Sequence, residues 1–79
     1  MPNDSQDDIG QLRDALSRAL HELAEALTAT NSYLHASQHL EERGDPASLA
    51  RLHEAIGKAV EQTNRAGEIV VRLRSVAGL

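Results

Sequence analysis

The chain has 79 residues, no cysteine, a single aromatic residue (Tyr33) and a formal net charge of −4 at pH 7. One domain of this length buries little core by itself, and without cysteine it has neither disulfides nor thiolate metal sites to add stability. The acidic balance argues against nucleic acid as a partner, the polar start is unlike a signal peptide, and no apolar run approaches the ~20 residues that span a bilayer. The sequence therefore predicts a soluble, cytoplasmic protein with no membrane segment.

The first predicted element is a long helix over residues 6–43, preceded by a flexible segment, residues 1–5. Ser5 and Asp8 have the spacing of a capping box that opens a helix. With Ile9 taken as heptad position a, apolar and small residues recur at positions a and d, and leucines at position e widen the stripe. Position a falls at residues 9, 16, 23, 30 and 37, position d at residues 12, 19, 26, 33 and 40, and position e holds Leu20, Leu27 and Leu34. A stripe this wide is typical of a helix in a bundle.

Residues 44–79 are predicted to form a turn and a second helix. Gly44 suits the position after a helix, Asp45 an N-cap and Pro46 the first helical residue. The second helix carries an apolar pattern at a/d spacing: Leu49, Leu52, Ile56, Ala59, Thr63, Ala66, Val70 and Leu73, with Val60, Ile69 and Val76 beside them. Gly57 and Gly67 lie inside this helix, where glycine costs about 1 kcal/mol of propensity, so we expect them to mark close approach to a neighbouring helix.

The expected fold is all-α. A turn this short forces the two helices to run antiparallel, and the apolar stripe on each is too wide for one partner helix to cover. Isologous dimerisation of two hairpins into a four-helix bundle is the simplest way to cover both stripes. The sequence therefore predicts a homodimer.

His21 is the residue with the clearest potential for chemistry. It falls at heptad position f, opposite the apolar stripe, so its imidazole is expected to face solvent with Nε2 free to attack a phosphoryl group. Glu22 follows directly and could hold the Nδ1 proton as an orienting group or general base. The alternative interpretation is that His21 is one more polar residue on a solvated face.

The remaining histidines are weaker candidates. His35 and His39 lie four residues apart and could share a metal ion, but Glu42 is the only adjacent carboxylate on that side of the helix, so surface residues are the better interpretation. His53 falls at position e of the second helix and is expected at the boundary of the apolar stripe. The sequence shows no glycine-rich phosphate loop and no nucleophilic serine or cysteine in a recognisable setting. We therefore expect no metal and no cofactor.

Two runs of residues resemble one known family. His21-Glu22-Leu23, followed by Leu27-Thr28-Ala29, resembles the H-box of sensor histidine kinases. The run over residues 59–74 is similar to the Glu-Gln-x-x-Arg-Ala-Gly-x-Ile-Ile-x-Arg-Leu-Arg segment that closes the same domain in some of these kinases. The resemblance covers roughly residues 12 to 76. It identifies the chain as similar to the dimerisation and histidine phosphotransfer domain.

This resemblance implies a helical hairpin that dimerises into a four-helix bundle, with His21 accepting phosphate and the receiver domain of a response regulator docking beside it. Glu25 stands where the family usually has Thr, Asn or Gln, and Ala26 stands where it has the proline that bends the helix. The ATP-binding domain of the kinases has no room after Leu73. The chain is therefore expected to be at most the phosphoacceptor part of a phosphotransferase, charged by a kinase elsewhere.

Three functions follow as hypotheses. The chain is a two-component phosphotransfer module in which His21 relays phosphate to a response-regulator aspartate, an interpretation favoured by the His21-Glu22 pair. Alternatively it is a non-catalytic interaction protein that binds or inhibits a histidine kinase or response regulator, which Glu25 and Ala26 favour because both depart from the family pattern. The third hypothesis is a purely structural dimerisation bundle.

Overall fold

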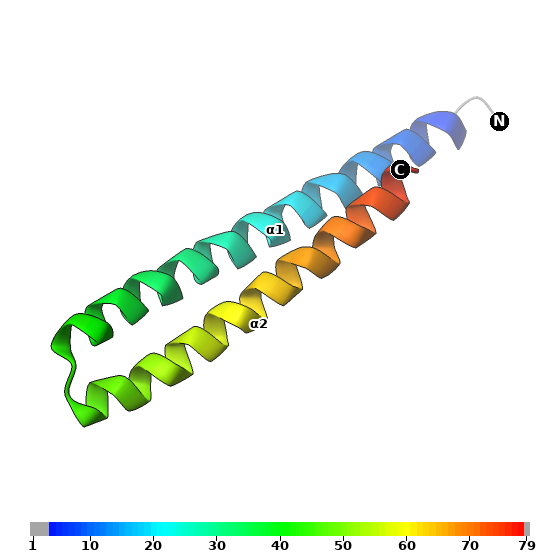
Figure 1. Cartoon of the computed structure of the whole chain (residues 1–79). Coiled ribbons are helices and arrows are strands. Elements are labelled where there is room, and N and C mark those ends of the chain that lie inside the picture. Colours follow the sequence, from blue (N-terminus) through cyan, green and yellow to red (C-terminus); the bar gives the residue numbers. More distant parts are fainter. Residues whose placement is uncertain (1–3, 79) are drawn as a thin grey trace.

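The chain folds as a long antiparallel helical hairpin in the computed structural model, which describes residues 4–78. Helix α1 (Asp4–Arg43) and helix α2 (Pro46–Ala77) lie side by side along their lengths (Figure 1). The molecule measures 67 × 16 × 13 Å. The predicted all-α hairpin is confirmed. Helix α1 starts at Asp4, two residues earlier than predicted, and residues 1–3 of the expected flexible segment lie outside the described residues.

Local chemistry at the turn explains why one helix stops and the next begins. Gly44 has φ 67°, which glycine adopts without steric cost, and its N–H donates to the Leu40 carbonyl over 3.2 Å. Asp45 is extended, at φ −76° and ψ 159°, and its carboxylate accepts hydrogen bonds from the Ser48 N–H (3.1 Å) and hydroxyl (2.6 Å). Pro46 is the first residue of α2. The predicted roles of all three turn residues are confirmed.

The core of the hairpin is small and built largely of alanine. Ala26, Ala66 and Ile69 form a buried cluster, and Ile69 is only 1% exposed. Three half-buried residues pack around this cluster: Ala19, Leu23 and Leu73. Small side chains at the centre let the two helices approach closely along one seam.

The packing of the hairpin shows which columns of the apolar pattern of α2 face α1. With Leu49 as position a, the d column (residues 52, 59, 66 and 73) contributes to the seam with α1, as expected. The a column does not, because Leu49, Ile56, Thr63 and Val70 are exposed. The g column takes its place, with Ser48, Ala55, Gln62 and Ile69 buried or half-buried. One partner helix covers only two columns of α2, and the small Ala55 on the g column lets that side lie close to α1.

The glycines inside α2 have open space around them. A Cβ built on Gly57 or Gly67 meets no other atom within 4 Å, and both residues are exposed. The predicted close approach of a neighbouring helix at these positions is therefore wrong for the hairpin.

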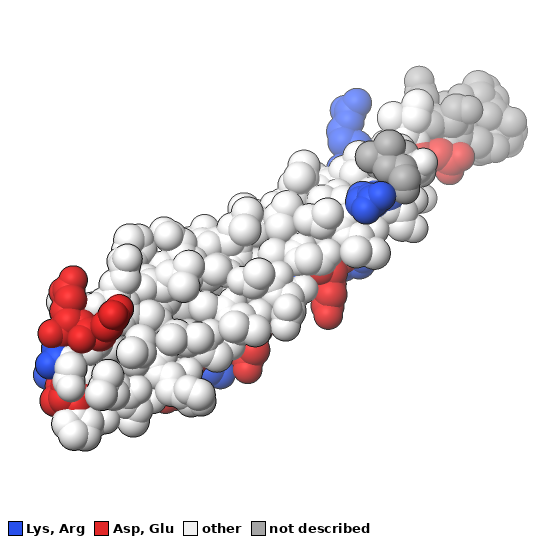
Figure 2. Space-filling view, in the orientation of Figure 1, with Lys and Arg blue, Asp and Glu red and all other residues white. Residues whose placement is uncertain are grey.

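The hairpin leaves one broad side apolar and uncovered. We call this side the apolar face and define it by seven exposed residues: Leu20, Leu27 and Leu34 of α1, and Leu49, Ile56, Val60 and Val70 of α2. Because the helices run antiparallel, the e column of α1 and the a column of α2 turn away from the seam toward the same side of the hairpin. Figure 2 shows that side, with almost no charge along the middle of both helices. No helix in the described part of the chain is long and apolar enough to cross a membrane.

Helix α1 is longer than α2 and projects beyond it. Gly78, at φ 74°, ends α2 with its N–H directed to the carbonyls of Arg74 and Ser75. Val76, near that end, lies beside Ala15 and Leu16 of α1. The N-terminal turns of α1, residues 4–14, therefore extend past the end of α2 (Figure 1), and we call them the overhang.

Candidate functional site

His21 lies near the open end of the hairpin, on the side of α1 that faces away from α2. Its side chain is 76% exposed. Position f is opposite the seam formed by positions a and d, so the helical periodicity alone turns this side chain outward. An imidazole in this setting is accessible to a large partner such as a second protein domain.

The acidic neighbour of the His21 ring is Glu25. The Nε2 atom of His21 lies 3.0 Å from Oε1 of Glu25, one helical turn further along α1. Both side chains are exposed, so a pair of this kind contributes only about 0.3–0.5 kcal/mol. The contact places a carboxylate on the ring nitrogen that was expected to be free.

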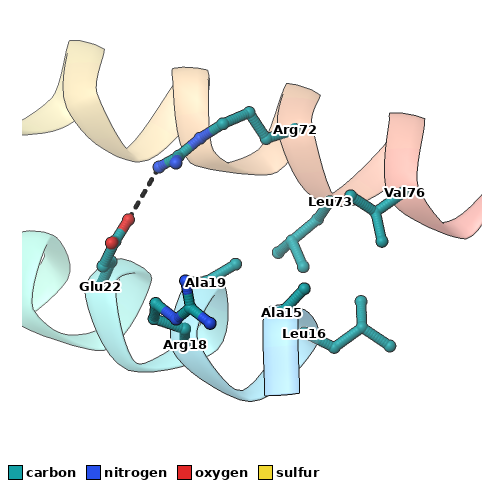
Figure 3. Close-up of a pocket in the computed structure, with 8 residues that line it drawn as sticks. All are labelled: Ala15, Leu16, Arg18, Ala19, Glu22, Arg72, Leu73 and Val76. Carbon is teal, nitrogen blue, oxygen red and sulfur yellow. Dashed lines mark hydrogen bonds and ion pairs between the residues drawn. The ribbon is translucent and has the colours of Figure 1, made fainter. Parts of the chain in front are cut away.

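Glu22 is directed across the hairpin. Its Oε2 accepts a hydrogen bond from Nη2 of Arg72 in α2, at 2.8 Å (Figure 3). That hydrogen bond holds the pKa of the Glu22 carboxyl below its usual value, and the positive charges of Arg72, Arg65 and Arg18 act in the same direction. The structure thus brings Glu25 to His21 and Arg72 to Glu22, whereas the sequence had suggested Glu22 as the orienting group of the histidine.

A small hollow lies beside the Glu22–Arg72 pair, between the two helices. Its volume is about 150 Å³, and eight residues line it (Figure 3): Ala15, Leu16, Arg18, Ala19, Glu22, Arg72, Leu73 and Val76. The side chains of Ala15 and Ala19 are too short to fill the space between α1 and α2, which leaves Leu73 and Val76 as an apolar floor. Arg72 and Glu22 close one side of the hollow.

Ala26 has a structural place in the hairpin. It is 0% exposed and forms the centre of the buried cluster with Ala66 and Ile69. Its carbonyl accepts a hydrogen bond from the Thr30 hydroxyl at 2.8 Å. A proline here would clash with the preceding turn of α1 and remove a helical hydrogen bond. With alanine in place of proline, α1 continues without interruption below His21.

The other histidines stand apart from this site. His35, His39 and His53 are all exposed. No group of three potential metal ligands occurs among the residues that the structure describes. His35 and His39 thus have no third ligand near them in this hairpin.

Sequence reasoning did not identify Arg72 as the partner of Glu22, although a signal was present. Basic residues recur every seven positions along α2, at position c: Arg51, Lys58, Arg65 and Arg72. Such a column on the edge of the seam can reach carboxylates of α1, but pairing a particular arginine with Glu22 requires the register of the two helices.

In comparisons with known proteins, no protein-family model and no solved structure matches the chain.

Proposed function

We propose that the chain is a dimeric phosphotransfer module of two-component signalling, in which His21 accepts a phosphoryl group and passes it to an aspartate of a response-regulator receiver domain. The observation that carries this proposal is the exposure of His21 on the outward side of a rigid helix, where a partner domain can reach the ring. The likeness of residues 21–29 and 59–74 to histidine kinases supports the same role. The phosphoryl donor is a kinase elsewhere or a small acyl phosphate.

In this proposal Glu25 limits the reaction. Attack by Nε2 on phosphorus requires the lone pair of that nitrogen, so the Glu25 carboxylate must first leave its position 3.0 Å away. After transfer, the same carboxylate stands one helical turn from the negative phosphoryl group and repels it. Glu25→Gln should therefore raise the rate of phosphorylation.

The Glu25 contact also favours a second candidate function, an interaction protein without chemistry. In that case the hairpin binds a histidine kinase or a response regulator through its helical surface, and His21 needs no free nitrogen. Binding would then survive the replacement of His21, which separates this function from the relay.

The proposed dimer covers the apolar face. The single hairpin exposes 6086 Å² of surface, whereas a compact chain of this length exposes about 4700 Å². Its radius of gyration is 18.6 Å, whereas about 12 Å is typical of a compact chain of this length. Both values support association of the hairpin with a second copy. The hydroxyl of Thr63, in the middle of the apolar face, already donates to the Ala59 carbonyl at 2.9 Å. It can therefore be buried against a second copy without leaving an unpaired donor.

Labelling with acetyl phosphate, or with an active histidine kinase domain, tests the relay. The wild type should acquire an acid-labile, alkali-stable label, and His21→Gln should remove it. His35→Gln is the matched control, since His35 occupies the same heptad position two heptads further along α1. An unlabelled wild type in the presence of excess active kinase contradicts the relay. Receiver or kinase binding that is indifferent to His21→Gln would then establish the interaction protein.

Light scattering tests the dimer with two neighbouring valines. Val70 belongs to the apolar face, whereas Val71 is 65% exposed and points away from it. The wild type should have twice the chain mass, and Val70→Asp should shift it to the monomer because a buried, unpaired carboxylate is costly. Val71→Asp should leave the dimer intact. A wild type that is monomeric at micromolar concentration contradicts the four-helix bundle.

A further inference from the structure

We propose that His21 takes the phosphoryl group on Nδ1 and not on Nε2, and that Glu25 fixes this choice. The inference rests on the proposed phosphotransfer function and names the reacting atom within it. It reverses the arrangement expected from the sequence, in which Glu22 holds the Nδ1 proton and Nε2 attacks. Two contacts carry it, that of His21 with Glu25 and that of Glu22 with Arg72.

The contact with Glu25 determines which ring nitrogen of His21 carries the proton. A neutral imidazole has one N–H group and one nitrogen with a free lone pair. The Nε2 atom of His21 lies 3.0 Å from Oε1 of Glu25, and a carboxylate oxygen only accepts hydrogen bonds. Nε2 therefore carries the proton in this contact, which leaves the lone pair of the neutral ring on Nδ1.

The carboxylate that was expected at Nδ1 is engaged elsewhere. Oε2 of Glu22 accepts a hydrogen bond from Nη2 of Arg72 at 2.8 Å, so the Glu22 side chain reaches toward α2 (Figure 3). The His21 ring lies on the side of α1 that faces away from α2. A proton on Nδ1 held by Glu22 would require the bond to Arg72 to break, whereas a proton on Nε2 requires no rearrangement.

Attack through Nε2 meets two obstacles. The Nε2 proton must first be lost and the Glu25 carboxylate displaced from its contact with the ring. The approaching phosphoryl group also carries negative charge, which a carboxylate beside that nitrogen repels. Because both side chains are exposed, we expect the lost contact and the repulsion together to slow this route about two- to fivefold. Nδ1 is free of the contact and farther from the carboxylate.

Attack through Nδ1 uses the pair as it stands. The Nδ1 lone pair forms the N–P bond while the bond from phosphorus to the leaving oxygen of an acyl phosphate breaks, and the leaving carboxylate keeps that electron pair. The proton stays on Nε2, where Glu25 accepts its hydrogen bond and offsets the positive charge that develops on the ring. Glu25 is thus a positioning residue, which contacts the far nitrogen and does not touch phosphorus.

The position of the label on the ring tests the inference. After reaction with acetyl phosphate, isomer-specific antibodies and phosphorus NMR assign the phosphorylated nitrogen, and the wild type should carry mainly Nδ1-phosphohistidine. Glu25→Gln should lower the ratio of Nδ1 to Nε2 product about two- to fivefold, because an amide can accept from Nε2 or donate to it. Glu25→Lys should lower the ratio further, because an ammonium group only donates. An identical ratio in all three proteins overturns the inference.

Nitrogen NMR of the unphosphorylated ring gives an independent measurement, since a nitrogen with a free lone pair and an N–H nitrogen resonate far apart. At about pH 8.5, above the usual histidine pKa of about 6.5, the His21 proton should lie mainly on Nε2, and Glu25→Gln should weaken this preference about twofold. His35 is the internal reference, because it has the same heptad position and is followed four residues later by His39 instead of a carboxylate. A proton mainly on Nδ1 of His21 overturns the inference.

Glu22→Gln separates the two carboxylates. If Glu25 directs the reaction, this variant should keep the product ratio of the wild type. A ratio that responds to Glu22→Gln and not to Glu25→Gln overturns the inference in favour of the arrangement expected from the sequence. A wild type labelled only on Nε2 also overturns it and leaves the phosphotransfer function standing, whereas an unlabelled wild type overturns both.

Discussion

Glu22 and Arg72 are separated by 50 positions in the sequence and joined by a 2.8 Å hydrogen bond between carboxylate and guanidinium. Within the part of the chain that the structure describes, it is the one side-chain hydrogen bond that links α1 to α2. It lies one residue from His21 and beside the hollow at the open end of the hairpin. The pair therefore ties the helix that carries the candidate phosphoacceptor to a fixed register against α2.

A double-mutant cycle on this pair should give a measurable coupling between the helices. Glu22→Gln and Arg72→Gln, singly and together, should give a small favourable coupling energy in the free energy of unfolding, as expected for an exposed charged pair. The control is the Lys58–Glu61 pair, at 3.8 Å within α2, which should give a smaller value. Urea denaturation at one protein concentration provides the measurement. A coupling equal to that of the control would show that the bond does not hold the helices in register.

Asp45 should make stability depend on pH. Hydrogen bonds from the Ser48 side chain and backbone lower the pKa of its carboxyl. Its contribution is therefore complete above the usual aspartate value, about 3.9, and is lost as the pH falls through the lowered value. Asp45→Ala should lower the free energy of unfolding at pH 7, with the difference from the wild type shrinking in stronger acid. Glu42→Ala, an exposed change in the last turn of α1, should have little effect. A difference that grows on acidification would contradict the capping role.

Two glycine substitutions should change stability in opposite directions. Gly57→Ala should raise the melting temperature by the equivalent of about 0.5–1 kcal/mol, since a Cβ there meets no atom and alanine favours the helix. Gly44→Ala should lower it, because φ 67° is unfavourable for a residue with a Cβ. Thermal denaturation followed by circular dichroism is sufficient. A loss of stability in Gly57→Ala would mean that a second copy packs against this position.

Ile69 and Val71 should differ sharply although they are two residues apart. Ile69 is 1% exposed in the centre of the core, so Ile69→Ala should cost about 2–5 kcal/mol per chain. Val71 is 65% exposed, so Val71→Ala should stay within about 0.5 kcal/mol of the wild type. The unfolding free energies of the two variants at equal concentration check this. Similar losses would mean that α2 is rotated relative to the orientation described above.

The local features of this fold follow from the sequence because short-range chemistry determines them. Gly44, Asp45 and Pro46 specify the turn through their own backbone preferences and a cap that reaches only three residues ahead. The outward position of His21 follows from the helical period, and its contact with Glu25 is one between neighbouring turns of the same helix.

Only the tertiary structure determined two features that depend on the packing of both helices: the rotation of α2 and the partner of Glu22. Periodicity defines the columns on α2 but not its rotation about its own axis, so only packing against α1 shows that the column of Ile69 faces inward and that of Val70 outward. Likewise, Glu22 has several arginines within reach of its side of α1, and the register of the antiparallel pair selects Arg72. Both outcomes depend on how closely the two helices approach along the alanine-rich seam. The distance of approach depends on the surfaces of both helices together, so neither sequence segment determines it alone.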